Sequence, residues 1–449
     1  MIDDADPRLA RKSLWRGGAA SLAVKTAQVA AAFVVTFVLA RALGAEGLGV
    51  YAFAWSVVMV LGIPVQVGLP QLVLRETAAS VAREEWGQLR GLWRWSEGVV
   101  LGLSAAVAGL AAALLWAAPE FLGTERRTTL AVGLAVLPLV GLGNLRGAAL
   151  RGLTHVALGQ LPEAVLRPFL FAAAVSLFAF WWEGPVPPAL AMALLAGASA
   201  VAWGTGRGLL LRRRPVALAA GPAPVFRSRA WLAAALPLGA VAALQLVLGH
   251  MDVLMLGVLR SDAEVGTYRV AVQLSLLVGL GLQIAHMVIA PWVARYRVEG
   301  RAEELQQVVR GASRAVLAFS LPVSALLVLF GKPALALLFG APFVAAWPAL
   351  VVLSLGRLCS GAFGPVGLVL QMTGFERETL LGVGLAALAN VLLNGLLIPF
   401  FGGTGAAAAT ALALVLSHLV LHRLTLLRLG IDASVLSWPR RRVVAGDVG

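Results

Sequence analysis

The chain has 449 residues, of which 60% are hydrophobic and 13% are charged, and its mean hydropathy is +0.87. Water-soluble domains average about 45–50% apolar and about 25% charged residues, so this composition excludes a water-soluble fold and indicates a protein embedded in lipid. The formal net charge is +14, but the arginines lie in short loops between apolar runs rather than in one patch. This distribution indicates membrane topology and argues against a nucleic-acid partner.

Long apolar runs follow one another along the whole chain. A run of about 20 or more apolar residues is long enough to cross a bilayer as a helix. The runs that meet this criterion are 19–43, 49–74, 92–118, 128–150, 161–182, 188–211, 229–259, 266–294, 309–330, 345–372, 379–400 and 404–429. The sequence therefore predicts an all-α polytopic membrane protein with about 12 transmembrane helices.

Basic residues gather in alternate loops. Groups of arginines precede the first run, lie between the second and third, sixth and seventh, and eighth and ninth, and follow the last. The basic residues of the opposite loops are Arg41, Arg126, Arg127, Arg260 and Lys332. Because loops rich in lysine and arginine stay in the cytoplasm, we expect a cell inner (cytoplasmic) membrane protein with both termini cytoplasmic.

Two stretches of sequence indicate an internal repeat. When "VLARALGAEGLGVYAFA" (38–54) is aligned with "MLGVLRSDAEVGTYRVA" (255–271), Gly49 meets Gly266 and Tyr51 meets Tyr268, at a spacing of 217 residues. The chain has only three tyrosines, so this pair is informative. The repeat predicts two pseudo-symmetric six-helix lobes around a central cavity. The predicted divisions are an N-terminal lobe (1–214), a basic, proline-rich cytoplasmic linker (215–228) and a C-terminal lobe with a cytoplasmic tail (229–449).

Polar residues inside the apolar runs mark the expected cavity, because ionisable groups in a membrane are costly and usually face the protein interior. Pairs on one helix face occur in the first, seventh and eighth runs. The expected substrate-binding residues are Lys25, Gln28, Arg41, Gln245, Arg269 and Gln273. Since most of the deep charges are cationic, the cavity suits an anion such as a phosphate or a diphosphate.

Several of these residues also have simpler interpretations. Lys25 is close enough to the end of its run to extend to the headgroups. Asp252 is expected either to couple a proton or Na⁺ or only to balance the cations, for instance by pairing with Arg269. Glu163 and Arg167, four residues apart, are predicted to form a structural ion pair. The single cysteine and the absence of a Cys/His cluster indicate no metal site and no cofactor.

Several longer motifs follow one another along the chain, including "DVLMLGVLRSDAEVGTYRVAVQL" (252–274), "LFGAPFVAAWPALVVLSLG" (338–356) and "LNGLLIPFFGGTGAAAATALAL" (393–414). In this order they resemble the polysaccharide biosynthesis and export family. That family comprises O-antigen and teichoic-acid type lipid-linked oligosaccharide flippases of the multidrug/oligosaccharidyl-lipid/polysaccharide exporter superfamily. The resemblance implies alternating access between two lobes. It also implies that an undecaprenyl-diphosphate-linked oligosaccharide moves from the cytoplasmic to the outer leaflet for cell-surface polysaccharide assembly.

The resemblance further implies a lipid-linked glycan substrate, the lipid bilayer as surroundings, and a glycan polymerase and other polysaccharide assembly proteins as partners. Two other functions stay open at this stage. One is a multidrug/cation antiporter of the same superfamily, which would favour an acidic cavity. The other is a membrane polysaccharide polymerase or ligase, which would need a large outer loop with catalytic groups; the outer loops here are short, so we expect no enzyme.

Overall fold

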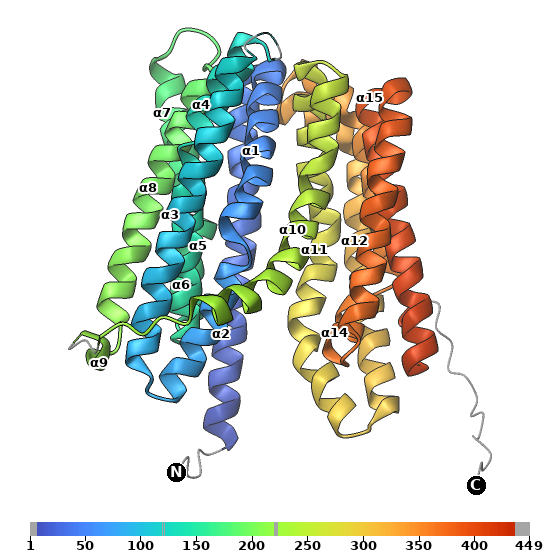
Figure 1. Cartoon of the computed structure of the whole chain (residues 1–449). Coiled ribbons are helices and arrows are strands. Elements are labelled where there is room, and N and C mark those ends of the chain that lie inside the picture. Colours follow the sequence, from blue (N-terminus) through green and yellow to red (C-terminus); the bar gives the residue numbers. More distant parts are fainter. Residues whose placement is uncertain (1–6, 119, 121, 220–222, 436–449) are drawn as a thin grey trace. The chain divides into compact units, whose positions relative to one another are not determined.

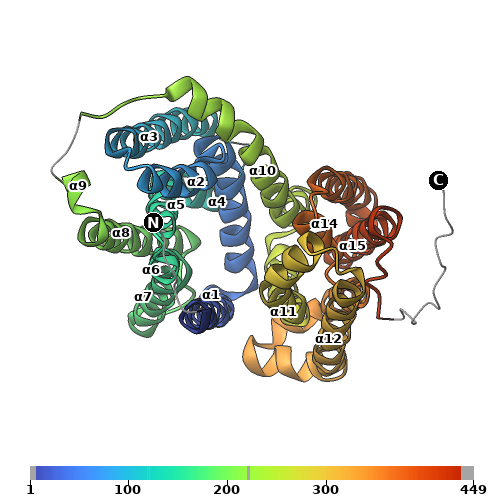
Figure 2. The same ribbon diagram turned by 90° about the horizontal axis from the view of Figure 1, so that it is seen from below.

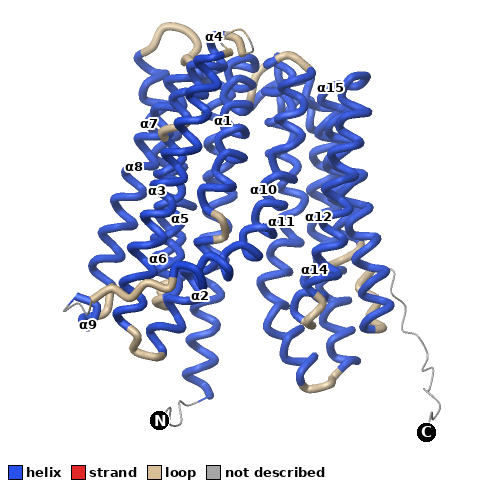
Figure 3. The backbone as a smooth tube through the Cα atoms, viewed as in Figure 1, coloured by secondary structure: helices blue, strands red, loops and turns tan. Residues whose placement is uncertain are grey.

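The computed structural model describes residues 7–118, 120, 122–219 and 223–435, and all of its regular secondary structure is helical (Figure 3). The helices carry the labels of Figure 1. Their bounds are α1 (Pro7–Gln66), α2 (Leu69–Ala82), α3 (Trp86–Ala117), α4 (Thr124–Gly133), α5 (Val136–Gly152), α6 (Val156–Leu161), the π-helical turn η1 (Pro162–Leu166), α7 (Arg167–Trp181), α8 (Pro188–Arg213), α9 (Val216–Ala219), α10 (Ser228–Leu259), α11 (Asp262–Val298), α12 (Ala302–Leu338), the 3₁₀ turn η2 (Ala341–Ala346), α13 (Trp347–Ala362), α14 (Val366–Met372) and α15 (Glu376–Leu429).

Ten helical segments of the described residues are long and apolar enough to cross a membrane. Two of them contain a glycine with a non-helical backbone: Gly44 in α1 (φ 72°, ψ −175°) and Gly402 in α15 (φ 54°, ψ −133°). Side chains other than hydrogen rarely tolerate these angles, so glycine lets the chain turn sharply there. Each of the two helices thus holds two of the predicted spans, and the all-α architecture with about 12 transmembrane helices is confirmed.

At some proline and glycine residues, the helix boundaries of the structure differ from the predicted ones. The predicted span 49–74 ends earlier, at Gln66, because Val67 and Gly68 adopt positive φ values and α2 starts afresh with Pro70 in its first turn. The predicted span 345–372 is divided at Gly364 and Pro365 into α13 and α14. A proline fixes its own φ and donates no backbone hydrogen bond, so a new helix starts next to it more easily than an old one continues.

The chain forms two compact units. The first consists of the described residues of Met1–Leu274, Phe330–Leu350 and Asn390–Ala409, and the second of those of Ser275–Leu329, Val351–Ala389 and Thr410–Gly449. The segment 1–214, predicted as a lobe, belongs to the first unit, whereas 229–449 contributes to both. Within the first unit α5 packs against α2, α3 and α8, as the end-on view in Figure 2 shows.

Each unit has a hydrophobic core, and the two cores are built from matching positions. One core contains Leu72, Leu92, Ala149 and Leu153, and the other contains Ile289, Val309, Val366 and Leu370. Taken in order, the members of the two sets are separated by 217 residues, the spacing that aligns Tyr51 with Tyr268. Burial of corresponding positions supports the predicted duplication, because a duplicated sequence keeps the same helix faces apolar.

The end of each predicted repeat is hydrogen-bonded to an earlier helix of the same repeat. After α8, the chain returns to the start of α3, where the amide of Val225 donates to the carbonyl of Gly87 over 2.9 Å. After α15, it returns to the start of α12, where Gln306 exchanges two hydrogen bonds with the backbone of Asp432. These returns satisfy backbone groups that would otherwise be left unpaired beyond a helix end.

Candidate substrate cavity

Two glycines of the repeat allow α1 and α11 to cross in close contact. A Cβ atom on Gly49 would overlap the carbonyl oxygen of Asp262, and one on Gly266 would overlap the carbonyl oxygen of Ala45. The two contacts are reciprocal, since each joins one helix to the residue four positions before the glycine of the other. Small residues four apart permit this approach of helix backbones in membranes. The crossing places the residues after Gly49 beside those after Gly266.

A cavity of about 200 Å³ lies next to this crossing, within the first unit. Segments of α1, α7, α8 and α11 form its wall. Its lining residues are Ala32, Val35, Thr36, Leu39, Leu48, Tyr51, Ala52, Trp55, Arg167, Pro168, Phe171, Leu195, Arg269 and Gln273. Two arginines thus share a cavity whose remaining wall is mostly apolar, and among the described residues that line it there is no acid.

Arg167 reaches the cavity from the junction of η1 and α7. The π-helical turn η1 begins at Pro162, and α7 starts with Arg167 and Pro168. π-Helical turns are rare and often occur at functional sites. Nη1 of Arg167 lies 2.8 Å from Oε2 of Glu163, so the predicted ion pair is confirmed. The sequence prediction treated this pair as structural only, whereas the structure also places Arg167 at the cavity.

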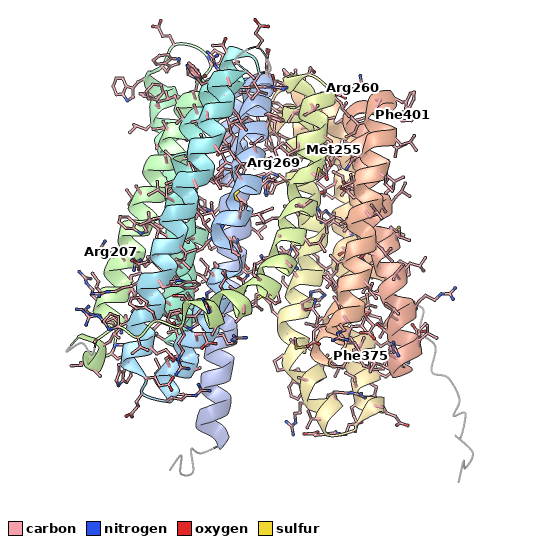
Figure 4. All side chains as sticks on the ribbon, viewed as in Figure 1. Arg207, Met255, Arg260, Arg269, Phe375 and Phe401 are labelled. Carbon is pink, nitrogen blue, oxygen red and sulfur yellow. The ribbon has the colours of Figure 1, made fainter. Side chains whose placement is uncertain are left out.

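Arg269 enters from α11 and is partly buried (Figure 4). It lies within electrostatic range of Asp252, Tyr51 and Tyr268. The hydroxyl of Tyr268 donates a 2.8 Å hydrogen bond to Oδ2 of Asp252, and both side chains are buried. The acid is therefore oriented by its tyrosine, and its charge offsets part of the charge of Arg269. Such compensation lowers the cost of holding an arginine inside a membrane.

The two tyrosines of the repeat have different roles. Tyr51 lines the cavity, and its ring stacks on Phe171 with centroids 5.9 Å apart. Tyr268 instead binds Asp252. Nearby, Nδ1 of His250 and the hydroxyl of Ser56 are 3.1 Å apart and join α10 to α1. The two aligned positions thus differ: the first lines the cavity, and the second donates a hydrogen bond to an acid.

Of the predicted site residues, Arg269 and Gln273 line the cavity, and Asp252 lies near Arg269. Lys25 and Gln28 hydrogen-bond to each other over 3.2 Å, one to two turns before Ala32, where the cavity wall begins. Gln245 is exposed on α10, two turns before Asp252. The structure therefore places three of the predicted residues together and the others along the same helices.

Arg41 also belongs to α1, but its side chain contacts the end of α12. Its guanidinium donates to the carbonyl oxygens of Leu337 and Leu338, the last residues of that helix. The final carbonyls of a helix have no partner within the helix, and they carry partial negative charge that attracts a cation. In this structure Arg41 consequently stabilises a helix end and is not among the residues that line the cavity.

Arg167, Tyr51 and Trp55 line the cavity but were not among the predicted site residues. Tyr51 was visible in the repeat, and Arg167 was visible as a charge inside an apolar run. These signals marked Tyr51 and Arg167 as candidates. Only the crossing of α1 with α11 and the turn at η1 showed that both residues line one cavity. Among the described residues no group of three histidines, cysteines or acids is placed to hold a metal ion.

The geometry can be compared with known proteins. Residues 14–297, more than half of the chain, match the family described as "Polysaccharide biosynthesis protein". The chain belongs to the polysaccharide biosynthesis protein family. The predicted resemblance is therefore confirmed, and this family member is a multi-pass membrane protein.

One curated relative of this family member is the "Probable low-salt glycan biosynthesis flippase Agl15" of Haloferax volcanii. The two are 24% identical over 172 residues, which cover 38% of this chain and 36% of that protein. The chain thus matches about a third of the length of this relative.

Solved structures with the same fold include transporters of the MOP superfamily and a lipid II flippase. An inward-facing multidrug resistance MATE transporter has a TM-score of 0.71 at 16% identity, covering 90% of this chain and 94% of that chain. Lipid II flippase MurJ, in an inward closed conformation, has a TM-score of 0.66 at 12% identity, covering 90% and 87%. A Pyrococcus furiosus MOP-superfamily transporter, described as having a binding pocket of reverse polarity, has a TM-score of 0.61 at 16% identity, covering 95% and 96%. At these identities the likeness shows the fold alone.

Proposed function

We propose that this protein flips an undecaprenyl-diphosphate-linked oligosaccharide from the cytoplasmic to the outer leaflet, by alternating access, for cell-surface polysaccharide assembly. Membership of the polysaccharide biosynthesis protein family supports a role in glycan assembly. The relative from Haloferax volcanii, named as a probable glycan biosynthesis flippase, supports movement of a lipid-linked glycan. The helical fold shared with transporters supports transport rather than catalysis.

The observation that carries this proposal is the pair of arginines in one membrane cavity. Arg167 and Arg269 line the same wall, and each guanidinium can bind phosphate oxygens with two parallel hydrogen bonds. Two cations near each other inside a membrane are costly unless anionic groups compensate them. A diphosphate carries enough negative charge and enough oxygens for both arginines.

The dimensions of the cavity fit the head of such a lipid. Its volume of about 200 Å³ is below the ~300–1,000 Å³ of pockets that enclose drug-sized ligands. It therefore suits the diphosphate and the first sugar, while the rest of the glycan extends out of it and the prenyl tail stays in lipid. Gln273, Tyr51 and Thr36 supply hydrogen-bonding groups for sugar hydroxyls.

The remaining predicted residues have auxiliary roles in this proposal. Lys25 and Gln28 attract the head group before it reaches the cavity. Asp252, held by Tyr268, balances the charge of Arg269 when the cavity is empty. Gln245 lines the approach along α10, and Arg41 meets the substrate on the outer side when α12 moves away.

The proposed surroundings follow from the arginine-rich loops. The protein lies in the cytoplasmic membrane with both termini in the cytoplasm. Its two lobes, 1–214 and 229–449, move relative to each other about the linker 215–228. A glycan polymerase and other polysaccharide assembly proteins use the lipid-linked glycan that reaches the outer leaflet.

A multidrug/cation antiporter is the second candidate, and the similarity to MATE transporter structures favours it. A cavity for cationic compounds needs acidic groups to attract them. The described lining residues here include two arginines and no acid. The polarity of the cavity therefore favours an anionic substrate over a cationic drug.

Deletion of the gene and complementation test the proposal. We expect the deletion strain to accumulate undecaprenyl-linked glycan on the cytoplasmic side of its membrane. The wild-type chain and R207Q, whose exposed arginine lies over Trp203 on α8, should clear the accumulated lipid. The double variant R167Q/R269Q should not. Normal glycan lipid in the deletion strain would contradict the function, and clearance by the double variant would contradict the site.

A further inference from the structure

The side chain of Glu163 forms an ion pair with Arg167, a residue of the cavity wall. Glu163 lies in η1, four residues before Arg167, and their side chains are 14% and 20% exposed. Oε2 of Glu163 and Nη1 of Arg167 are 2.8 Å apart. The same guanidinium that lines the cavity is therefore already in contact with a carboxylate of the protein.

Among the described residues, the carboxylate of Glu163 has few polar contacts other than Arg167. Both oxygens of Glu163 are buried, and among the described residues neither accepts a hydrogen bond of good geometry. On its other side Gly143 lies so close that a Cβ atom there would overlap Oε1. A buried carboxylate is expensive unless a partner compensates its charge. In the described part of the chain, Arg167 is the ion-pair partner of Glu163.

The other arginine of the cavity is arranged differently. The acid near Arg269 is Asp252, and its carboxylate already accepts a hydrogen bond from the hydroxyl of Tyr268. An anion that binds Arg269 can thus leave Asp252 in place with its tyrosine. An anion that binds Arg167, in contrast, competes with Glu163, because Arg167 compensates the charge of that carboxylate.

We propose that Glu163 is an internal competitor of the substrate for Arg167, and that it sets the affinity of the cavity for the diphosphate. The inference rests on the proposed function. In the empty cavity Glu163 holds Arg167. When the diphosphate enters, its oxygens bind the guanidinium that Glu163 had held as an ion pair. When the head group leaves, Glu163 takes Arg167 back, which favours release.

This competition has a kinetic consequence. A transporter that binds its substrate too tightly in the resting site releases it slowly, because the stabilised complex lies further below the transition state. Neutralising Glu163 should therefore tighten binding and slow turnover together. A glutamate that merely supported the fold would weaken both binding and turnover when it was changed.

The test measures binding of undecaprenyl diphosphate to the purified full chain in detergent. We expect E163Q to lower the Kd about tenfold, as the loss of one competing ion pair would do. The matched control is E97Q: Glu97 pairs with Arg146 at 2.5 Å in the same unit, but neither residue lines the cavity. The Kd of E97Q should stay close to that of the wild type.

A double-mutant cycle separates competition from a structural role. In an R167Q background, E163Q should no longer tighten binding, because the contested guanidinium is gone. In vesicles, E163Q should lower both the half-saturating lipid concentration and the maximal flipping rate. Because E163Q leaves Arg167 without its partner, thermal unfolding is measured alongside. E163D, which retracts the carboxylate by one methylene group, is the second variant and should tighten binding by a smaller factor.

The outcomes distinguish this inference from the proposed function. If the wild type binds undecaprenyl diphosphate but E163Q and E163D bind it equally well or more weakly, the competition is overturned and the proposed function stands. Tightening by E163Q that persists in the R167Q background would also overturn it. If the wild type does not bind the diphosphate lipid, the proposed function is overturned and this inference with it.

Discussion

Arg167 and Arg269 are the residues from which the cavity takes its chemistry. Both are charged groups on membrane-spanning helices, and each lies near one acid, Glu163 or Asp252. The acids lower the free-energy cost of holding the two arginines inside the membrane, and neither acid is among the residues that line the cavity. The wall of the empty cavity thus presents two cations, and an arriving anion binds arginines that the fold has already positioned.

At Arg269 the prediction concerns the shape of the cation as well as its charge. R269Q should weaken binding of undecaprenyl diphosphate at least about tenfold, since it removes a charge-assisted, two-pronged contact. R269K should recover only part of the loss, because an ammonium is a point charge without the planar fork. Equal affinities of R269Q and wild type would show that Arg269 does not contact the substrate. R207Q is the control outside the cavity.

At the residue scale, the sequence predicted only part of the cavity wall. Arg269 and Gln273 were predicted because they lie four apart on one face of an apolar run. Arg167 was read as one half of an ion pair, and that reading was right but incomplete. Spacing along one helix cannot show which residues of other helices share a cavity. That required the helix crossing, which depends on three-dimensional packing.

At the scale of elements, the crossing of α1 and α11 determines the cavity wall. Gly49 and Gly266 let the two helices approach, and they align with each other in the repeat that the tyrosine pair indicated. The positions of the spans could be predicted because twenty apolar residues match the thickness of a bilayer. The separate helix α2 and the π-helical turn η1 could not, since both depend on local backbone changes inside otherwise apolar sequence.

Adding one methyl group tests the crossing. G49A or G266A should destabilise the protein by about 1–3 kcal/mol, the usual cost of overpacking a tight contact, because the new Cβ would overlap a carbonyl oxygen of the other helix. G98A is the matched control, since a Cβ on Gly98 of α3 meets no heavy atom within 4 Å. It should be neutral or slightly stabilising. Thermal unfolding in detergent measures both, and equal stability of G49A and G98A would contradict the close crossing.

A second contact joins α4 to α10 and α11. Nε of Arg126 lies 2.9 and 3.1 Å from the two carboxylate oxygens of Asp262, and Nη1 donates to the carbonyl of Gly257 over 2.8 Å. The guanidinium also lies over the ring of Phe53, 4.8 Å from its centroid. This arrangement satisfies several donors of one arginine at once and fixes the ends of three helices.

Removal of this contact should loosen those helix ends. R126Q should destabilise the protein by about 3 kcal/mol, because it leaves the partly buried Asp262 without its partner. D262N should cost less than R126Q, since Arg126 keeps its bond to Gly257. The neighbouring R127Q, for which the described residues offer no ion pair, should change little. Unfolding temperatures that rank R127Q with R126Q would contradict this account.

At the scale of the whole molecule, duplication explains much of what could be predicted. The spacing of 217 residues recurs in the tyrosine pair, in the reciprocal glycine contacts and in the matching core positions. The two copies differ at the aligned tyrosines: Tyr51 lines the cavity, whereas Tyr268 binds Asp252. Composition and repeat thus predict the fold, and residues of both copies, among them Tyr51 and Arg269, line the cationic cavity.

The central claim is that the cationic cavity carries the head group of a lipid-linked glycan across the membrane. Its most direct test reconstitutes the purified chain in vesicles that contain a labelled undecaprenyl-diphosphate oligosaccharide in one leaflet. We expect the label to reach the other leaflet faster than in protein-free vesicles, and at least about tenfold more slowly with R167Q/R269Q than with the wild type. Movement no faster than in protein-free vesicles, together with export of a cationic dye by the same preparation, would contradict the account.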